Sequence, residues 1–113
     1  MHRKNRLTDR EDFKKVYRQG QSTANYQFAL YYMERADQGP FRVGVSVSKK
    51  IGKAVVRNRL RRRIKEAVRL NQHLLKDGYD LIIIARRASL NLNDFKALQK
   101  SLLHVLRKAS LLR

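Results

Sequence analysis

The sequence predicts an α+β fold in which a small mixed β-sheet packs against helices, with the elements in the order α-β-β-α-β-α. Three observations predict it. Apolar residues recur at three- and four-residue spacing in three segments, which is the period of an α-helix. Two segments alternate residue by residue, which is the period of a strand. The run Tyr79–Ala85 is nearly all apolar, as in a central strand buried on both faces.

A chain of 113 residues is expected to form a single domain, residues 1–113, with one modest core. Residues Met1–Leu7 are basic and are expected to be mobile until a ligand binds. Thr8 followed by Glu11 matches a capping box, so a short helix is predicted to continue to about Arg18. Its apolar face would carry Phe13, Val16 and Tyr17, for which ordinary core packing is the simplest interpretation.

Two strands are predicted next. The first runs from about Ser22 to Met33, and its face with Gln27 and Tyr31 can be exposed. Residues 36–40 (ADQGP) predict a hairpin loop. The second strand, Phe41–Ser48, would turn its valines inward and Arg42, Gly44, Ser46 and Ser48 outward. These small outward residues would let a nucleic-acid backbone approach, but they equally fit the plain surface of a sheet.

The segment Lys49–Arg69 (KKIGKAVVRNRLRRRIKEAVR) holds ten Lys or Arg residues and one acidic residue, Glu66. A helix that can continue to about Leu75 is predicted here, with an apolar seam of Val56, Leu60, Ile64, Ala67 and Val68. A solvated face is the ordinary interpretation of a charge run. Here, however, like charges four residues apart repel by a few tenths of a kcal/mol per pair. That uncompensated cost indicates a polyanionic partner.

The residue types in this helix favour RNA. Guanidinium groups bind phosphate through two parallel hydrogen bonds and stack on bases. Asn58, between two arginines, can reach a sugar hydroxyl or a base edge, which suits RNA with its 2′-OH. Gly52 permits a tight turn before the helix, and free N–H groups near Lys53 and Ala54 offer another anion site. A last helix is predicted from about Asn93 to Ala109.

Composition excludes several classes of function. The net charge is +18, and the three histidines and nine carboxylates show no catalytic or metal-ligand spacing. No catalytic residue is therefore expected on the protein, and a metal site is left unknown. Cysteine is absent. No signal peptide or membrane span is recognisable, so we expect a cytoplasmic protein without a membrane partner.

Several motifs have to be considered together. Three follow one another: Arg42–Ser48 (RVGVSVS), Lys49–Val55 (KKIGKAV) and Arg57–Arg62 (RNRLRR), the last followed by Lys65-Glu66. To these are added the N-terminal pattern Asn5-Arg6-Leu7, with Asp12-Phe13 and Val16-Tyr17, and the late strand ending Ile83-Ile84-Ala85-Arg86. Together these motifs resemble the protein subunit of bacterial ribonuclease P, and the resemblance covers about residues 4 to 109.

The resemblance implies an accessory subunit that pairs with a catalytic RNA to remove the 5′ leader of precursor tRNA. Mg²⁺ would be held largely by that RNA, and no obligate protein partner is implied. The fold would be that of the second domain of a ribosomal small-subunit protein, with a left-handed βαβ crossover. The implied RNA-subunit face comprises Lys49, Lys50, Lys53, Arg57, Asn58, Arg59, Arg61, Arg62, Lys65 and Arg69. The implied leader cleft comprises Phe13, Tyr17, Gln27, Phe28, Tyr31, Ser46 and Ser48.

Two other functions are weighed against this one. A ribosomal protein or general RNA chaperone would share the basic face but would not need an aromatic cleft. A stand-alone nuclease is disfavoured because carboxylates and histidines are not grouped in the sequence.

Overall fold

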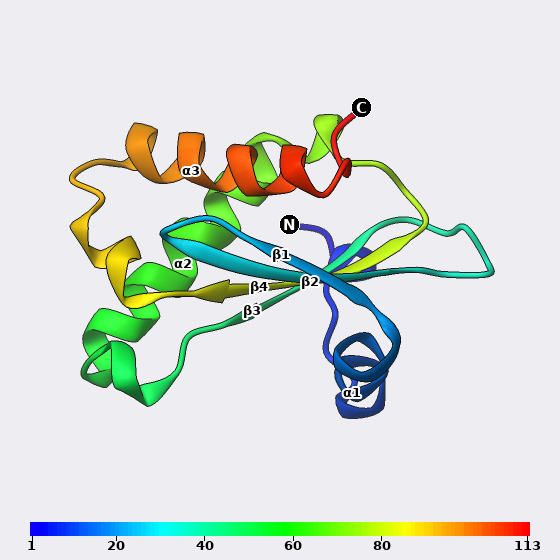
Figure 1. Cartoon of the computed structure of the whole chain (residues 1–113), viewed down its shortest axis with the longest axis horizontal. Coiled ribbons are helices and arrows are strands. Elements are labelled where there is room, and N and C mark those ends of the chain that lie inside the picture. Colours follow the sequence, from blue (N-terminus) through cyan, green and yellow to red (C-terminus); the bar gives the residue numbers. More distant parts are fainter.

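The computed structural model describes all 113 residues, which form one four-stranded sheet with helices on both faces (Figure 1). The strands lie in the order β1-β2-β4-β3; β3 and β4 are parallel, and the other neighbouring pairs are antiparallel. The predicted α+β fold with a mixed sheet is thus confirmed. The elements are α1 (Arg10–Gln19), β1 (Gln21–Ala24), β2 (Phe28–Glu34), β3 (Arg42–Ser46), α2 (Ala54–Leu70), β4 (Tyr79–Ala85) and α3 (Phe95–Lys108).

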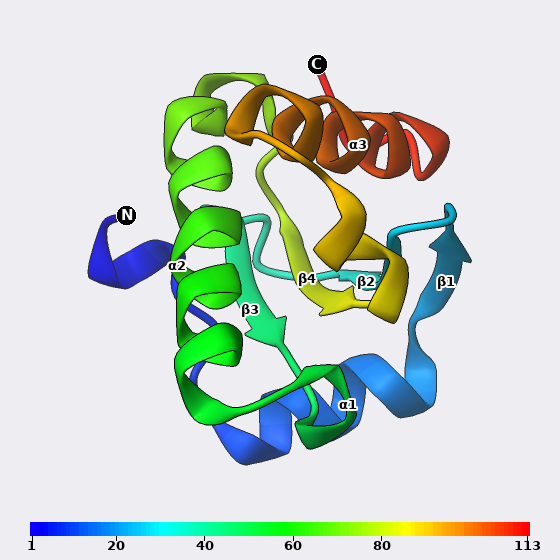
Figure 2. The same cartoon turned by 90° about the vertical axis from the view of Figure 1, so that its left-hand side faces the viewer.

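The two faces of the sheet carry different helices. α2 and α3 cover one face and enclose the main core, whereas α1 alone lies on the other (Figures 1 and 2). Val16 of α1 packs there on Ile82 of β4 and on Leu7. β4 is buried on both faces, as its apolar run predicts, because Leu81 and Ile83 belong to the main core and Ile82 packs against α1. None of the helices combines the length and the apolar content that crossing a membrane requires.

The predicted strand Ser22–Met33 is in fact two strands joined by a turn at Asn25. The side-chain oxygen of Asn25 accepts hydrogen bonds from the backbone N–H groups of Gln27 (3.0 Å) and Phe28 (2.8 Å). This local bond competes with the continuation of a strand. The chain therefore folds back, and β1 pairs with β2.

The segment Ala36–Pro40 is a loop, as expected, but it does not close a hairpin. β4 lies between β2 and β3, so the loop connects two strands that are not neighbours. Short loops usually join adjacent antiparallel strands, and this expectation fails because a later strand enters the sheet between them.

The N-terminal segment, predicted to be mobile, packs against the open edge of β3. Asn5 and Leu7 are buried. Asn5 donates through Nδ2 to the carbonyl of Phe41 (2.8 Å), and the Leu7 N–H donates to the carbonyl of Val43 (3.0 Å).

The first helix begins one residue later than predicted, because Asp9 rather than Thr8 caps it by accepting from the Glu11 N–H (2.8 Å).

The basic segment is not one continuous helix. Lys49–Ile51 form a separate 3₁₀ turn, Gly52 breaks the chain direction at φ 158°, and α2 starts at Ala54. The four later residues of the predicted apolar seam are buried in the main core. Val56, in the first turn of α2, is 39% exposed and does not belong to that core.

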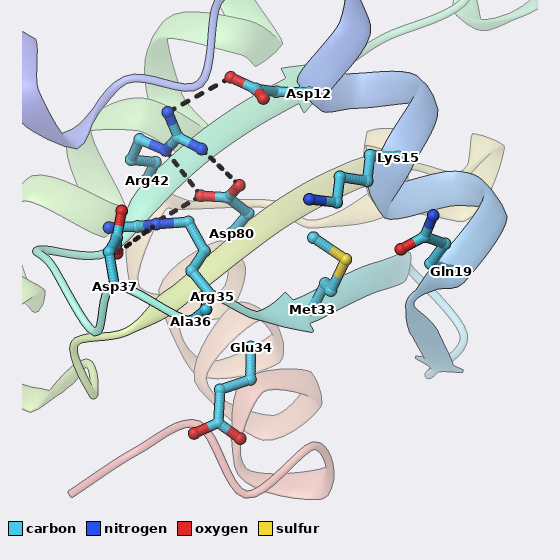
Figure 3. Close-up of a pocket in the computed structure, with 10 residues that line it drawn as sticks. All are labelled: Asp12, Lys15, Gln19, Met33, Glu34, Arg35, Ala36, Asp37, Arg42 and Asp80. Carbon is cyan, nitrogen blue, oxygen red and sulfur yellow. Dashed lines mark hydrogen bonds and ion pairs between the residues drawn. The ribbon is translucent and has the colours of Figure 1, made fainter.

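A buried carboxylate ties the two parallel strands to the neighbouring loop (Figure 3). Asp80 of β4 is 2% exposed and accepts hydrogen bonds from Arg42 Nε (2.7 Å) and Nη2 (2.6 Å) and from Arg35 Nη1 (3.0 Å). Arg42 also forms an ion pair with Asp12 of α1 (3.3 Å). The pKa of Arg42 is raised, mainly because its guanidinium group donates hydrogen bonds to Asp80. This network fixes the position of α1 relative to β3 and β4.

Candidate nucleic-acid interface

One flank of α1 places aromatic side chains beside the sheet. Val16 faces the sheet, and Phe13 and Tyr17, at three- and four-residue spacing, lie along one side of the contact. Tyr31 of β2 packs into the same small cluster. We call Phe13, Tyr17 and Tyr31 the aromatic strip. It is a partly exposed surface, with Tyr17 42% exposed, rather than a closed cavity.

The two tyrosines of the strip are held at a fixed angle. The ring centroids of Tyr17 and Tyr31 lie 5.0 Å apart with an interplanar angle of 66°, an edge-to-face contact. Burial raises the pKa of the Tyr17 hydroxyl, and the nearby Tyr31 adds to this, while a hydrogen bond with the Ser46 side chain opposes it. Ser46 of β3 thus belongs to the surface of the strip.

Phe13 lies next to a hollow at the open edge of β3. The hollow has a volume of about 300 Å³, and both Phe13 of α1 and Lys65 of α2 line it. The N-terminal segment completes it, with Met1, Arg6, Leu7 and Thr8 beside Val43, Gly44 and Val45. An apolar floor with two cations at its rim fits a base and its phosphates.

The polar and charged side chains of α2 form three groups, two of which contact other parts of the protein. Against the segment between β3 and α2, Arg57 donates through Nε to the carbonyl of Gly52 (3.1 Å), and Arg61 donates through Nη2 to that of Val47 (3.5 Å). On the opposite flank, Arg59 and Arg63 line a hollow of about 120 Å³.

The third group of α2 residues faces solvent. Asn58 accepts a hydrogen bond from Arg61 Nη1 (2.8 Å), and Arg62 and Lys65 are exposed without a carboxylate partner. Arg69 is different, because both its Nε and its Nη2 bind the carboxylate of Glu66 (3.0 and 2.5 Å). This bond lowers the pKa of Glu66.

The N-terminus of α2 offers free backbone donors. Lys53 occupies the N-cap position and makes no side-chain capping bond, and no acidic residue lies in the first turn. α1 and α3, in contrast, are both capped by aspartate. The first-turn N–H groups of α2, together with the exposed Lys49, Lys50 and Lys53, therefore form a positive end of the basic surface.

Comparison with known proteins places the chain in a family. The model of the family Ribonuclease P matches residues 1–110. A ribonuclease P protein component from Bacillus velezensis is 51% identical over 111 residues, which cover 98% of this chain and 94% of that protein. The structure of the Staphylococcus aureus RNase P protein superposes with a TM-score of 0.88 at 36% identity, covering 96% of this chain and 98% of that one. The RNase P protein from Thermotoga maritima gives a TM-score of 0.82 at 31% identity, with coverage of 91% and 96%.

This chain belongs to the ribonuclease P protein family. The match extends over nearly its full length, so the chain is the protein subunit of a ribonuclease P and part of an endoribonuclease that works with RNA. The motifs that carry the resemblance lie on α2, on β3 and on the flank of α1 described above.

Two residues expected in the leader cleft lie elsewhere in this ribonuclease P protein. Phe28 is 0% exposed and belongs to the main core beneath α2 and α3, so it cannot stack on a base in the strip. Gln27 accepts a hydrogen bond from Ser101 Oγ of α3 (2.8 Å) and is also directed away from α1. The alternation that would place Gln27 beside Tyr31 does not hold, because Gln27 lies in the turn before β2. Ser48 is exposed just beyond β3.

Sequence patterns miss one contributor to this surface. Arg6 lines the hollow beside Phe13 because its segment forms a parallel bridge with Val43, which no periodicity reveals. Its only sequence signal is the basic, N-terminal Asn5-Arg6-Leu7 pattern. Gly44, expected to face outward and leave room for a nucleic-acid backbone, is covered by Phe13 instead.

Proposed function

We propose that this protein is the accessory subunit of its ribonuclease P. In this role it binds the 5′ leader of precursor tRNA on the aromatic strip and the catalytic RNA on the basic surface of α2. The observation that carries the proposal is the hollow that both Phe13 and Lys65 line. It joins the two surfaces, so a single strand that leaves the strip passes directly to the cations of α2.

The strip suits a single strand of RNA. Partly exposed aromatic rings stack on bases of any sequence, at about 1–3 kcal/mol per base. The edge-to-face contact between Tyr17 and Tyr31 holds the rings in place before a ligand arrives, which reduces the entropy lost on binding. Ser46 provides a hydroxyl beside them.

The surface of α2 suits a structured RNA. Arg59 and Arg62 are exposed, and the backbone carbonyls bound by Arg57 and Arg61 hold those two guanidinium groups against the body of the protein. Rigidly held arginines lose little side-chain freedom when they bind phosphate. Binding through such contacts displaces counterions and weakens steeply with salt.

The chemistry is assigned to RNA rather than to protein side chains. No three histidine, aspartate or glutamate side chains lie close enough together to bind a metal ion. The buried carboxylate of Asp80 is occupied by Arg35 and Arg42. We therefore propose that the RNA subunit, rather than this chain, holds the Mg²⁺. Partners of this kind also favour a cytoplasmic location.

The test is cleavage of precursor tRNA by a bacterial ribonuclease P RNA at low Mg²⁺, with and without this protein. Substrates with a long leader and with a one-nucleotide leader are compared. We expect the protein to stimulate cleavage, more strongly for the long leader. A Phe13→Ala/Tyr17→Ala variant should lose this dependence on leader length, whereas Tyr17→Phe, which keeps the ring, should retain it.

Two outcomes would change the assignment. Stimulation that is equal for both leaders would preserve the subunit role but remove the strip as the leader site. Absence of stimulation, although the protein binds the RNA, would contradict the accessory role.

A further inference from the structure

A second aromatic side chain projects from a fixed turn on the side of the molecule that carries α3. Tyr26 is 75% exposed, whereas Phe28 two residues later is buried. Asn25 holds the turn between β1 and β2 with both ends of its side-chain amide. Oδ1 accepts two hydrogen bonds from backbone N–H groups within the turn. Nδ2 donates to the backbone carbonyl (2.9 Å) and to Oγ (3.2 Å) of Ser101 of α3. An exposed ring on a turn fixed in this way can stack on a base with little loss of freedom.

Two cationic side chains donate hydrogen bonds to backbone carbonyls at this turn. Lys108 donates through Nζ to the carbonyl of Ala24 (2.7 Å), and Arg86 donates through Nη1 to that of Asn25 (3.3 Å). The outer face of α3 adds further basic side chains at four- and three-residue spacing: Lys96, Lys100, His104 and Arg107.

No carboxylate neutralises these groups. None of the ion pairs in the structure involves a residue of α3, nor Arg86. Asp94, which precedes this helix, is engaged as its N-cap and accepts from the Ala97 N–H (2.8 Å). Like charges on one helix face repel, so this face also carries a cost that a bound polyanion would relieve.

A hollow of about 390 Å³ lies between the turn and α3. Its lining combines cations with groups that can form hydrogen bonds: Asn25, Gln27, Lys100, Ser101, His104 and Arg107. Gln27 uses its carbonyl oxygen to accept from Ser101, and His104 uses Nδ1 toward Asn25 (3.2 Å). The amide nitrogen of Gln27 and Nε2 of His104 make no hydrogen bond within the protein, which leaves both for a base or a sugar hydroxyl.

We propose that the β1–β2 turn and the outer face of α3 form a second binding surface for single-stranded RNA. Tyr26 stacks on a base, Lys100 and Arg107 bind the flanking phosphates, and Gln27 and His104 contact the polar edge of a nucleotide. The surface is separate from the aromatic strip, because α3 and α1 cover opposite faces of the sheet (Figure 1). The proposal does not depend on leader binding by the strip.

The test measures binding of a fluorescent, unstructured RNA of about 12 nucleotides, within the range of site sizes of single-strand binders. The full chain carries Phe13→Ala/Tyr17→Ala, so that stacking on the strip does not contribute. Adding Tyr26→Ala should weaken binding about tenfold, as expected for the loss of one stacked base. Adding Lys100→Ala/Arg107→Ala should reduce the salt slope by about 1.4, which is about 0.7 for each of two phosphates of a single strand that the protein no longer neutralises.

The matched control is Lys4→Ala/Lys76→Ala, which removes the same charge from exposed positions outside the turn and α3. It should leave the salt slope nearly unchanged. Equal losses in Lys100→Ala/Arg107→Ala and in this control would mean that only net charge matters, which overturns the proposal.

Two further measurements localise the contact. The backbone amide resonances of Ser101 and His104 should shift on addition of the RNA, and constant resonances would contradict binding at this surface. A duplex RNA of the same length offers no free base for Tyr26, so Tyr26→Ala should not weaken its binding. An equal loss for duplex and single strand would exclude stacking by Tyr26.

Discussion

The ring of Phe13 lies so close to Gly44 that a Cβ atom on Gly44 would overlap it. Gly44 is in the middle of β3, and the aromatic residue that it accommodates comes from α1. The absence of a side chain at this position therefore sets the distance between the first helix and the sheet. It also holds Phe13 beside the hollow that Lys65 shares.

Replacing Gly44 by Ala should displace the Phe13 ring. The expected cost is about 1–3 kcal/mol in the free energy of unfolding, as for overpacking in a well-packed site. Binding of leader RNA should weaken as well, because Phe13 would move. Urea denaturation and leader-dependent cleavage measure the two effects.

A double-variant cycle checks the cause. In a Phe13→Ala background, Gly44→Ala should cost little, because the ring that it would displace is gone. An undiminished cost in that background would mean that Gly44 is required for the strand itself rather than for Phe13.

Replacing Asp80 by Asn should destabilise the fold strongly. It leaves Arg35 and Arg42 without the buried charge that pairs with both, and breaking a buried pair in this way costs about 3–5 kcal/mol. The partial exposure of Arg42 places the expected loss at about the lower end of that range. Glu11→Gln, which removes an exposed pair with Lys14, is the control and should leave the denaturation midpoint unchanged.

Stability at alkaline pH should depend on Tyr17. Burial raises the pKa of its hydroxyl in the folded protein, so as pH rises through about 10 the unfolded chain loses this proton first. Ionisation then favours unfolding, and the contribution of Tyr17 to stability is lost with rising pH. The melting temperature of Tyr17→Phe, relative to the unsubstituted protein, should therefore increase between about pH 8 and pH 10.5. A constant difference would mean that burial of the hydroxyl has no such effect.

The arginines of α2 should separate into two functional pairs. Arg59→Ala/Arg62→Ala removes exposed groups, so it should reduce the salt slope of RNA-subunit binding by about 1–2 and leave the melting temperature unchanged. Arg57→Ala/Arg61→Ala should reduce both, because these side chains also bind the carbonyls of Gly52 and Val47. An unchanged salt slope in both variants would remove α2 from the interface.

The parts of this fold that follow from short-range patterns are predictable from the sequence. Periodicity identifies the seam of α2 from Leu60 to Val68, and the apolar run identifies β4 as the central strand. Turn chemistry is less visible. Asn25 ends a strand through its own side chain, and an isolated Asn within an alternating segment gives only a weak signal for this.

Contacts between residues that are far apart in the sequence cannot be predicted from local sequence patterns. The burial of Asn5 depends on the Phe41 carbonyl 36 residues later. The insertion of β4 between β2 and β3 is decided by the whole sheet. At the candidate site, helical spacing correctly places Phe13 and Tyr17 together, but it cannot show that Phe13 occupies the space above Gly44.

The uncapped N-terminus of α2 predicts a conflict between stability and RNA binding. Lys53 already has the extended backbone conformation of an N-cap residue, at φ −66° and ψ 163°, but its side chain cannot accept a hydrogen bond from the first turn. Lys53→Ser should therefore stabilise the protein by about 0.5–2 kcal/mol, which is the range measured for N-cap residues.

The same substitution should weaken binding of the RNA subunit. It removes a positive charge and supplies an internal partner for first-turn N–H groups, which are otherwise free to bind an anion such as phosphate. Asp94→Ala on α3 is the control, because loss of that cap should lower the melting temperature without weakening this interface. If Lys53→Ser raises the melting temperature while RNA-subunit affinity and its salt dependence stay constant, the first turn of α2 does not contact RNA. If both change as expected, the missing cap is a cost in stability that RNA binding requires.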